Sequence, residues 1–459
     1  MERDTICALS TPYGIAGIGI IRLSGPDTLK IIEKIFKPGR KRKIGKVWQT
    51  HTVRYGYIVD DYEKVIDEVL VTIMKAPSSY TREDMAEIGC HGGIAAIKAI
   101  LSLCISCGAR LAQPGEFTKR AFLNGRIDLA QAESILEIVN AKTEEALQLS
   151  IKQLQGSLSK KINDIRSQLM EVLTLLNYEI DFSEDYGSIV NTKIIDKIES
   201  TSEQIRSIIK EGQSGRIFSE GVKIAIVGKP NVGKSSLLNI LVKEDRAIVS
   251  DIPGTTRDSI EAIINIQGIP FTIIDTAGIR HHTDEIEKIG VERSLKWIEK
   301  AEMVLVMLDS FSGIDQLDLQ IIEMARNKPH IIILNKCDLP YCIDEDEIKK
   351  ISTKSDVIKI SCITGEGIDH LHSLIIEKLN EGLCEIKNPQ FFINIRQNNL
   401  LEKTLKILEE IKNTMNNNGN CDVLAEMIKF AITELDEIPG KNLSDEVLDE
   451  IFSRFCVGK

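Results

Sequence analysis

Eight residues near the middle of the chain, from Gly228 to Ser235, match the phosphate-loop pattern G-x-x-x-x-G-K-[ST]. An apolar run precedes them and a helix-like run follows them, which is the context that this pattern requires. Backbone N–H groups at such a helix start form a cradle for a nucleoside triphosphate. Lys234 is predicted to reach the β/γ-phosphates and to act in catalysis, and the Ser235 hydroxyl to ligate Mg²⁺. Further nucleotide contacts are predicted at Asn231, Val232, Gly233 and Ser236.

Three later motifs predict that the nucleotide is GTP. A strand-like run ends in Asp275, Thr276, Ala277 and Gly278, which places a carboxylate near the metal and a glycine N–H near the γ-phosphate. Another run ends in Asn335, Lys336 and Asp338. The Asp338 carboxylate can accept hydrogen bonds from the ring N–H and the amine of guanine, which adenine cannot satisfy. Ser361 is predicted to lie in a further guanine-side loop.

Hydrolysis of GTP in many small GTPases uses a Gln directly after the Asp-x-x-Gly motif. Ile279 occupies that position here and cannot orient water. The segment from Ser250 to Thr256 offers a threonine hydroxyl for Mg²⁺ at Thr256 and several backbone carbonyls. With Asn231, it can surround a K⁺ ion that neutralises transition-state charge. The predicted K⁺ ligands are Asn231, Ser250, Ile252 and Thr255, and the predicted GTP contacts of this segment are Ser250, Asp251, Ile252, Pro253, Gly254, Thr255 and Thr256.

The elements around these motifs predict a multidomain protein of the α/β and α classes. Strands alternate with helices around the phosphate loop, and each motif follows a strand, which predicts a doubly wound, mostly parallel sheet. Before it lies an α+β region with a hairpin of residues 52–59 and 68–74. Amphipathic helices flank the sheet domain on both sides and are predicted to pack together as one discontinuous helical domain. Residues 212–221 are glycine-rich and predict a linker.

Composition bounds the remaining possibilities. The 459 residues are 43% hydrophobic, enough for two or three domains with their own cores. A net charge of −11 argues against a broad surface that coats nucleic acid, although residues 37–46 form a basic stretch that is either a solvated loop or an RNA contact. Ten scattered cysteines predict a reducing compartment. No run approaches a membrane span, so a cytoplasmic protein is expected.

Motifs outside the GTPase region narrow the family. They include Ile21 to Gly25, His91 to Gly93, Pro114 to Asn124, Asp128 to Glu133 and the terminal run Phe455 to Lys459. From end to end the chain resembles the MnmE (TrmE) family of tRNA-modification GTPases. The resemblance implies a fold of four segments: a folate-binding and dimerisation domain at 1–120, helical segments at 121–218 and 380–459, and an inserted GTPase domain at 219–379.

The resemblance also implies a function. The family works as a homodimer with an FAD-dependent partner, MnmG, and adds an aminomethyl or carboxymethylaminomethyl group at carbon 5 of the wobble uridine of tRNA. A 5-formyl- or methylene-tetrahydrofolate supplies the one-carbon unit. Folate contacts are implied at Arg22, Glu87, Arg126 and Lys459, where Arg126 replaces the family's usual lysine. Catalytic roles are implied for Glu287 and for the tail thiol of Cys456.

Two other classes of function stay open from the residues alone. One is a regulatory GTPase that binds the ribosome or rRNA and modifies nothing. The other is a signalling GTPase that acts on a protein effector. Neither uses the folate-like N-terminal motifs or the Cys456 tail, and nucleoside analysis of tRNA distinguishes them from the modification enzyme.

Overall fold

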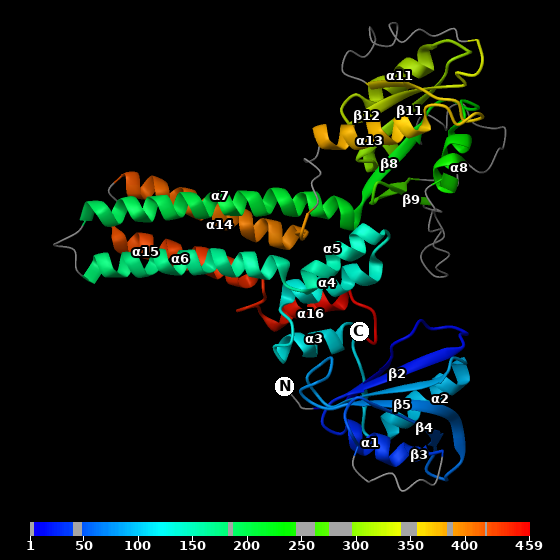
Figure 1. Cartoon of the computed structure of the whole chain (residues 1–459), viewed down its shortest axis with the longest axis vertical. Helices are drawn as coiled ribbons and strands as arrows, with labels where there is room; N and C mark the ends of the chain where they lie inside the picture. Colours follow the sequence, from blue (N-terminus) through cyan, green and yellow to red (C-terminus); the bar gives the residue numbers. More distant parts are fainter. Residues whose placement is uncertain are drawn as a thin grey trace. The chain divides into compact units, whose positions relative to one another are not determined.

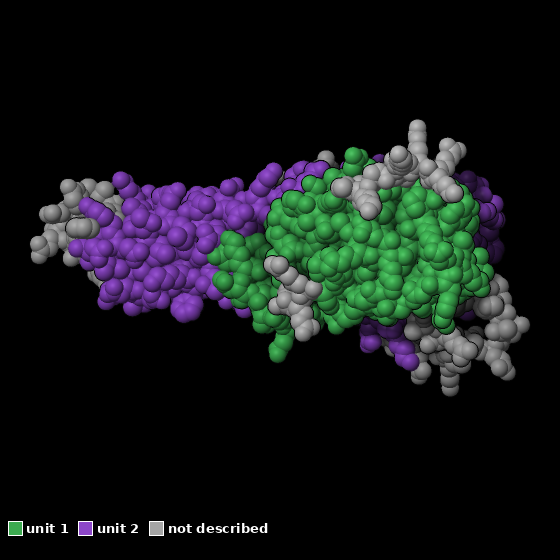
Figure 2. All heavy atoms as spheres, turned by 90° about the horizontal axis from the view of Figure 1, so that it is seen from below, with its two compact units in different colours: residues 1–136, 436–459 green, residues 137–435 purple. Residues whose placement is uncertain are grey.

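The computed structural model describes residues 4–39, 48–181, 187–244, 262–274, 296–340, 356–382, 389–417 and 420–459. The chain forms two compact units, residues 1–136 with 436–459 and residues 137–435, which Figure 2 shows in green and purple. Apolar side chains of β-strands and helices build separate cores in the two units. Below, they are called unit 1 and unit 2.

Unit 1 is built on a seven-stranded sheet in the order β3-β4-β5-β6-β2-β1-β7. All neighbours are antiparallel except the parallel pair β1 and β7. The predicted hairpin is confirmed as β4 and β5, with Tyr57 opposite Glu68. The strands are β1 (Ile6–Leu9), β2 (Ile18–Ser24), β3 (Phe36–Pro38), β4 (Thr52–Val59), β5 (Val65–Met74), β6 (Met85–His91) and β7 (Arg110–Leu111).

Helices α1 (Thr28–Ile35) and α2 (Ile94–Ser106) supply the apolar side chains that pack on this sheet. Ile31, Ile32 and Ile35 recur at helical spacing and are buried, which gives α1 one apolar face. Burial of one such side chain stabilises the fold by about 1.5–3 kcal/mol. The helices therefore fix β2 and β6, the two strands that carry Arg22 and Glu87.

Unit 1 also holds α3 (Glu116–Leu123), the start of α4 (Leu129–Asn140) and the last helix, α16 (Asp445–Ser453). A reciprocal capping pair precedes α4, since Asp128 and Gln131 each accept the other's backbone N–H, at 2.8 and 2.9 Å. Gly115 has φ +67, and a Cβ there would lie 2.5 Å from the Phe452 carbonyl oxygen. Glycine at this position therefore lets α16 pack closely against the start of α3.

In unit 2, helices from both sides of the GTPase segment pack together, as the sequence predicts. Figure 1 shows α14 running beside α7. Arg206 on α7 bonds Glu409 on α14 at 2.9 Å, and Leu408 between them is fully buried. The helices are α5 (Glu144–Leu154), α6 (Ser157–Asp181), α7 (Gly187–Glu220), α14 (Ile395–Asn416) and α15 (Cys421–Glu437).

The linker predicted at residues 212–221 is wrong, because α7 continues as a helix to Glu220. Its glycines serve packing instead of flexibility. A Cβ at Gly212 would lie 2.6 Å from the Ile393 side chain, and one at Gly215 would lie 2.1 Å from the Phe391 carbonyl oxygen. Close packing of the returning chain offsets the roughly 1 kcal/mol that each glycine costs inside a helix.

The second sheet lies in unit 2 and has the order β13-β12-β11-β8-β10-β9. Only β9 is antiparallel to its neighbour, so the predicted mostly parallel sheet is confirmed. Its two faces have separate cores, one with α8 and α13 and the other with α11, which makes the sheet doubly wound. The elements are β8 (Val222–Val227), α8 (Lys234–Glu244), β9 (Ala262–Ile266), β10 (Ile269–Ile273), β11 (Met303–Asp309), α11 (Gln316–Ala325), β12 (His330–Asn335), β13 (Asp356–Lys359) and α13 (Ile368–Gly382).

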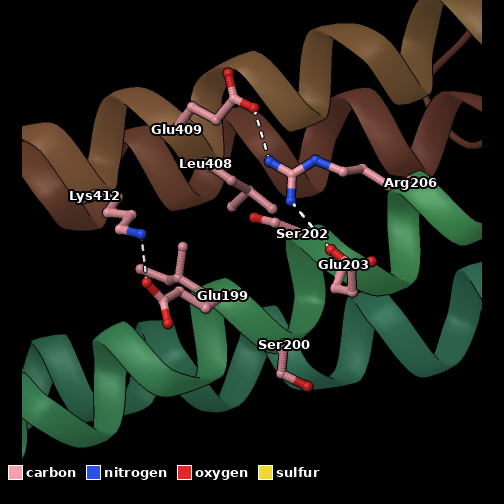
Figure 3. Close-up of a pocket in the computed structure, with 9 residues that line it drawn as sticks. Glu199, Ser200, Ser202, Glu203, Arg206, Leu408, Glu409 and Lys412 are labelled. Carbon is pink, nitrogen blue, oxygen red and sulfur yellow. Dashed lines mark hydrogen bonds and ion pairs between the residues drawn. The ribbon is translucent and has the colours of Figure 1, made fainter.

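A shallow groove runs between α7 and α14 (Figure 3). Its charged side chains pair with one another: Lys412 with Glu199, and Arg206 with both Glu203 and Glu409. These ion pairs therefore link α7 to α14, and the charged side chains of the groove are paired with one another. Within the described residues, no helix combines the length and the apolar character that crossing a membrane requires.

Candidate functional site

The phosphate loop connects the end of β8 to the start of α8. Gly228 has φ +152, and a Cβ there would lie 2.4 Å from the Met307 carbonyl oxygen of β11. Gly233 has φ +105, and a Cβ there would lie 2.1 Å from the Asn335 side-chain amide. Both pattern glycines are thus required by the neighbouring strands. Between them Val232 is buried, whereas Asn231 is exposed with φ +64.

Lys234 begins α8 and turns its amine back over the loop. Its Nζ donates to the carbonyl oxygens of Gly228 at 2.8 Å and Lys229 at 2.5 Å. Burial disfavours the ammonium form and lowers the pKa of Lys234 to about 8. A triphosphate beside this amine favours the charged form, so binding of nucleotide raises the pKa again.

Above pH 8, the affinity for GTP should therefore fall as free Lys234 loses its proton. Affinity should be level below that pH and drop by up to about tenfold per pH unit above it. Calorimetric titration with a non-hydrolysable GTP analogue at pH 7 and at pH 9 measures the change. Lys234→Met is the control, because its side chain has no proton to lose. Any change of affinity with pH that remains in this variant comes from the guanine base alone. Equal wild-type affinities at the two pH values would contradict the assignment.

The guanine-side residues lie together at the carboxyl ends of β12 and β13. The Ser361 hydroxyl donates to Asp338 Oδ1 at 2.6 Å and accepts the N–H groups of Ile363 and Thr364 at 3.2 Å each. These contacts hold the exposed Asp338 carboxylate in one orientation. Lys336 has φ +70 and donates to Asp309 Oδ2 at 2.6 Å, so β11 supports the same loop.

Asn335 joins the phosphate loop to both guanine-side loops. Its buried side-chain amide donates to the Val232 carbonyl oxygen at 2.8 Å, and its Oδ1 accepts the N–H of Cys362 at 3.1 Å. The sequence places Asn335 in the site but gives no sign of this bracing role, which depends on contacts between loops far apart in the chain.

The remaining predicted contacts of the GTPase segment lie outside the described residues. These are Ser250, Asp251, Ile252, Pro253, Gly254, Thr255, Thr256, Asp275, Thr276, Ala277, Gly278 and Glu287. Of the predicted K⁺ ligands, the structure describes Asn231. Of the predicted Mg²⁺ ligands, it describes Ser235, near the start of α8.

A second cluster lies in unit 1, on neighbouring strands. Arg22 of β2 is opposite Glu87 of β6 in the sheet register, and its Nη2 and Nε donate to Glu87 Oε1 at 2.8 and 3.0 Å. The remaining nitrogen, Nη1, donates to the Gly458 carbonyl oxygen at 3.1 Å. Two predicted ligand residues are therefore in contact with each other and with the C-terminal tail.

The tail is held at this pair by several backbone contacts. Gly458 has φ +92, and a Cβ there would lie 2.3 Å from the Leu9 carbonyl oxygen. The Ser10 hydroxyl also donates to the Gly458 carbonyl oxygen at 3.1 Å. Gly115 donates its N–H to the Cys456 carbonyl oxygen at 3.3 Å, and the Cys456 side chain is exposed. The terminal Lys459 follows directly and is half-buried.

Tyr80 brings the fourth predicted residue, Arg126, to the same cluster. Arg126 Nη1 donates to the Tyr80 carbonyl oxygen at 3.0 Å, and its guanidinium lies 4.5 Å from the ring centroid. The Arg22 guanidinium lies 5.5 Å from the same ring and 5.7 Å from that of Phe117. Sequence reasoning missed Tyr80, whose only signal is an aromatic residue in a polar loop.

Two family models cover the chain. The model described as "GTP-binding protein TrmE N-terminus" matches residues 5–126, and the one described as "MnmE helical domain" matches residues 129–456. The tRNA modification GTPase MnmE of Thermoanaerobacter pseudethanolicus is 45% identical over 461 residues, which cover 100% of both chains. That of Acetivibrio thermocellus is 44% identical over 463 residues, again covering 100% of both.

Solved structures also match part of the chain. A crystal structure of Aquifex aeolicus Era bound to GDP.AlF4- is 29% identical and covers 40% of this chain and 66% of that chain. Its TM-score is 0.28. The full-length relatives and the two family models are the matches that decide the family.

Proposed function

Because this chain belongs to the MnmE family of tRNA modification GTPases, we propose that it is the GTP-hydrolysing subunit of a complex that modifies wobble uridine. The product carries an aminomethyl or carboxymethylaminomethyl group at carbon 5. An FAD-dependent partner, MnmG, shares the chemistry, and a folate supplies the carbon. One observation carries the proposal, namely that the same chain holds two sites. Unit 2 has a phosphate loop joined to the guanine-side loops, and unit 1 has a second cluster around the docked C-terminal tail.

The GTP site divides its tasks among the loops. Backbone N–H groups of residues 231–236 receive the phosphates, Lys234 offsets their charge, and Asp338 selects guanine. Ser235 and Thr256 are the proposed Mg²⁺ ligands, and Asn231, Ser250, Ile252 and Thr255 the proposed K⁺ ligands. Asp275, Thr276, Ala277 and Gly278 are proposed to contact the γ-phosphate side, and Asn335, Lys336 and Ser361 to shape the base pocket. Both cations bind oxygen ligands, which the hydroxyl, amide and carbonyl groups of these residues supply.

The unit 1 cluster suits a folate of the 5-formyl- or methylene-tetrahydrofolate type. Its charges have both signs: Glu87 can accept from the pterin's amine donors, and Arg22, Arg126 and Lys459 can bind the glutamate carboxylates. The Tyr80 ring supplies a flat apolar surface for an aromatic system. The exposed Cys456 thiol lies in the same tail and is the proposed reactive group of unit 1.

Glu87→Ala should weaken 5-formyl-tetrahydrofolate binding by on the order of tenfold or more, because a charge-assisted hydrogen bond contributes about 1.5–3 kcal/mol. Fluorescence titration of the purified full chain measures the affinity. Glu63→Ala is a matched control, since Glu63 pairs with Lys37 at 2.6 Å on the exposed edge of unit 1. Wild-type affinity in the Glu87 variant would show that the cluster is not the folate site.

We also propose a homodimer formed through the first domain and a cytoplasmic location. The proposed domain limits are residues 1–120, 121–218, 219–379 and 380–459. Reconstitution tests the proposal as a whole. Label should appear in the wobble nucleoside when the chain is mixed with MnmG and its FAD, GTP, Mg²⁺, K⁺, unmodified tRNA, a folate labelled at its one-carbon group, and ammonium or glycine as the source of the aminomethyl nitrogen. If GTP is hydrolysed but no label enters the nucleoside, the chain is a GTPase without the proposed role in tRNA modification.

A further inference from the structure

Lys229, the second residue of the phosphate loop, is tied to α11, a helix outside that loop. Its Nζ lies 2.8 Å from Asp315 Oδ2 and 2.7 Å from Asp318 Oδ2, both at the start of α11. The Lys229 side chain is only 16% exposed and the Asp318 side chain 2%. This is a partly buried ion pair with two carboxylates, unlike the flexible surface pairs that contribute little.

The two carboxylates are themselves fixed by the helix. Asp315 is the N-cap of α11 and accepts the N–H groups of Leu317 and Asp318, at 3.0 and 3.1 Å. Asp318 completes the capping box by accepting the Asp315 N–H at 3.2 Å. Further along α11, Ile321 and Ile322 are buried in a core of the sheet. The ammonium group of Lys229 is therefore anchored on a rigid element.

The backbone of Lys229 also contacts the Lys234 amine, which is proposed to bind the phosphates. The loop has a first limb at Gly228 and Lys229 and a second limb at Val232. The Lys229 carbonyl oxygen accepts the Lys234 hydrogen bond at 2.5 Å, so the first limb of the loop and this phosphate-binding amine are held together. The second limb is held by the hydrogen bond from the Asn335 side chain to the Val232 carbonyl oxygen. The loop is thus held on both limbs, by a buried amide on one side and by an ion pair on the other.

We propose that Lys229 is a positioning residue of the phosphate loop: its pairing with Asp315 and Asp318 holds the first limb in the shape that receives the nucleotide phosphates. The proposal rests on GTP binding as part of the proposed function. Without the brace the limb must be ordered at the moment of binding, and ordering one residue's backbone costs about 1–2 kcal/mol, or roughly tenfold in affinity. The cradle binds ground state and transition state alike, so kcat should change little.

The test compares purified full-length variants by GDP and GTP-analogue titration and by GTP turnover. Lys229→Met should weaken both nucleotides by the same factor, on the order of tenfold, with kcat within about threefold of wild type. Lys229→Arg keeps the charge and can bridge both carboxylates, so it should restore affinity. Lys378→Met is the matched control, since Lys378 is also 16% exposed and pairs with Asp356 and Glu381, at 2.5 and 2.9 Å, away from the loop.

The double variant Lys229→Met with Asp318→Asn separates positioning from folding. Lys229→Met alone leaves a buried carboxylate without its cation, which lowers stability. Removing that charge should recover the melting temperature and leave nucleotide affinity weak. Recovery of affinity in the double variant would overturn the proposal, as would wild-type affinity in Lys229→Met or an equal loss in Lys378→Met. A wild-type chain that binds no guanine nucleotide would instead overturn the proposed function.

Discussion

Asp338→Asn should lower GTP affinity by on the order of 10²- to 10⁴-fold, because two charge-assisted hydrogen bonds to guanine are lost at about 1.5–3 kcal/mol each. In the wild type the Ser361 hydroxyl holds Asp338 Oδ1 at 2.6 Å and so orients the carboxylate. In the variant an amide N–H faces guanine's own N–H donors. The donors of the amide and of guanine then repel each other, and both are left without an acceptor.

Xanthosine triphosphate provides the matched control for this variant. Xanthine carries a carbonyl oxygen where guanine has an amine, so the new amide can donate to it. Titration of wild type and Asp338→Asn with both nucleotides should show a reversal of preference. Unchanged GTP binding by the variant would mean that the guanine pocket lies elsewhere.

Replacing K⁺ by Na⁺ should slow single-turnover GTP hydrolysis by on the order of 10³-fold, the effect of losing a transition-state charge of arginine-finger type. The expectation comes from Ile279 in place of a water-orienting glutamine and from the oxygen-rich segment after Ser250. Because Na⁺ prefers smaller cages than a carbonyl-rich ring provides, it should substitute poorly. Equal rates in the two salts would contradict the cation site.

Glu287→Ala should reduce the rate by a similar order in K⁺, since general-base or water-orienting groups contribute about 10²- to 10⁴-fold. The resemblance implies this role for Glu287, which lies among several acidic residues. Glu285→Ala, two residues away, is the matched control and should keep its rate. A fully active Glu287 variant would remove the glutamate from the mechanism.

Local patterns were enough to predict the GTPase fold and its described motifs. The sequence from Gly228 to Ser235 requires a strand before it and a helix after it, and β8 and α8 are in those places. Asn335 ends β12 and Ser361 comes soon after β13, so the parallel pairing of these strands brings the two residues to the same end of the sheet. The four folate-site candidates came from family resemblance. In the structure Arg22 pairs with Glu87 and with the Gly458 carbonyl oxygen, and both Arg22 and Arg126 lie near the Tyr80 ring.

Other features depend on contacts that a single sequence does not contain. Glycines at 212 and 215 read as a linker because the residues that pack on them, Phe391 and Ile393, lie far along the chain. Lys229 occupies a variable position of the phosphate-loop pattern, so the pattern assigns it no role. Its partners Asp315 and Asp318 lie after a different strand and are not evident from the motif. In each case the physical cause is tertiary packing that overrides local propensity.

GTP hydrolysis by this chain is proposed to serve tRNA modification, and the nucleosides of tRNA test this role most directly. In cells that lack the chain, mass spectrometry should show unmodified carbon 5 in wobble uridine where wild-type cells carry the aminomethyl-type group. Wild-type chain should restore the modification, and Asp338→Asn expressed at the same level should not. An unchanged nucleoside profile in the cells without the chain would contradict the account and favour a regulatory GTPase.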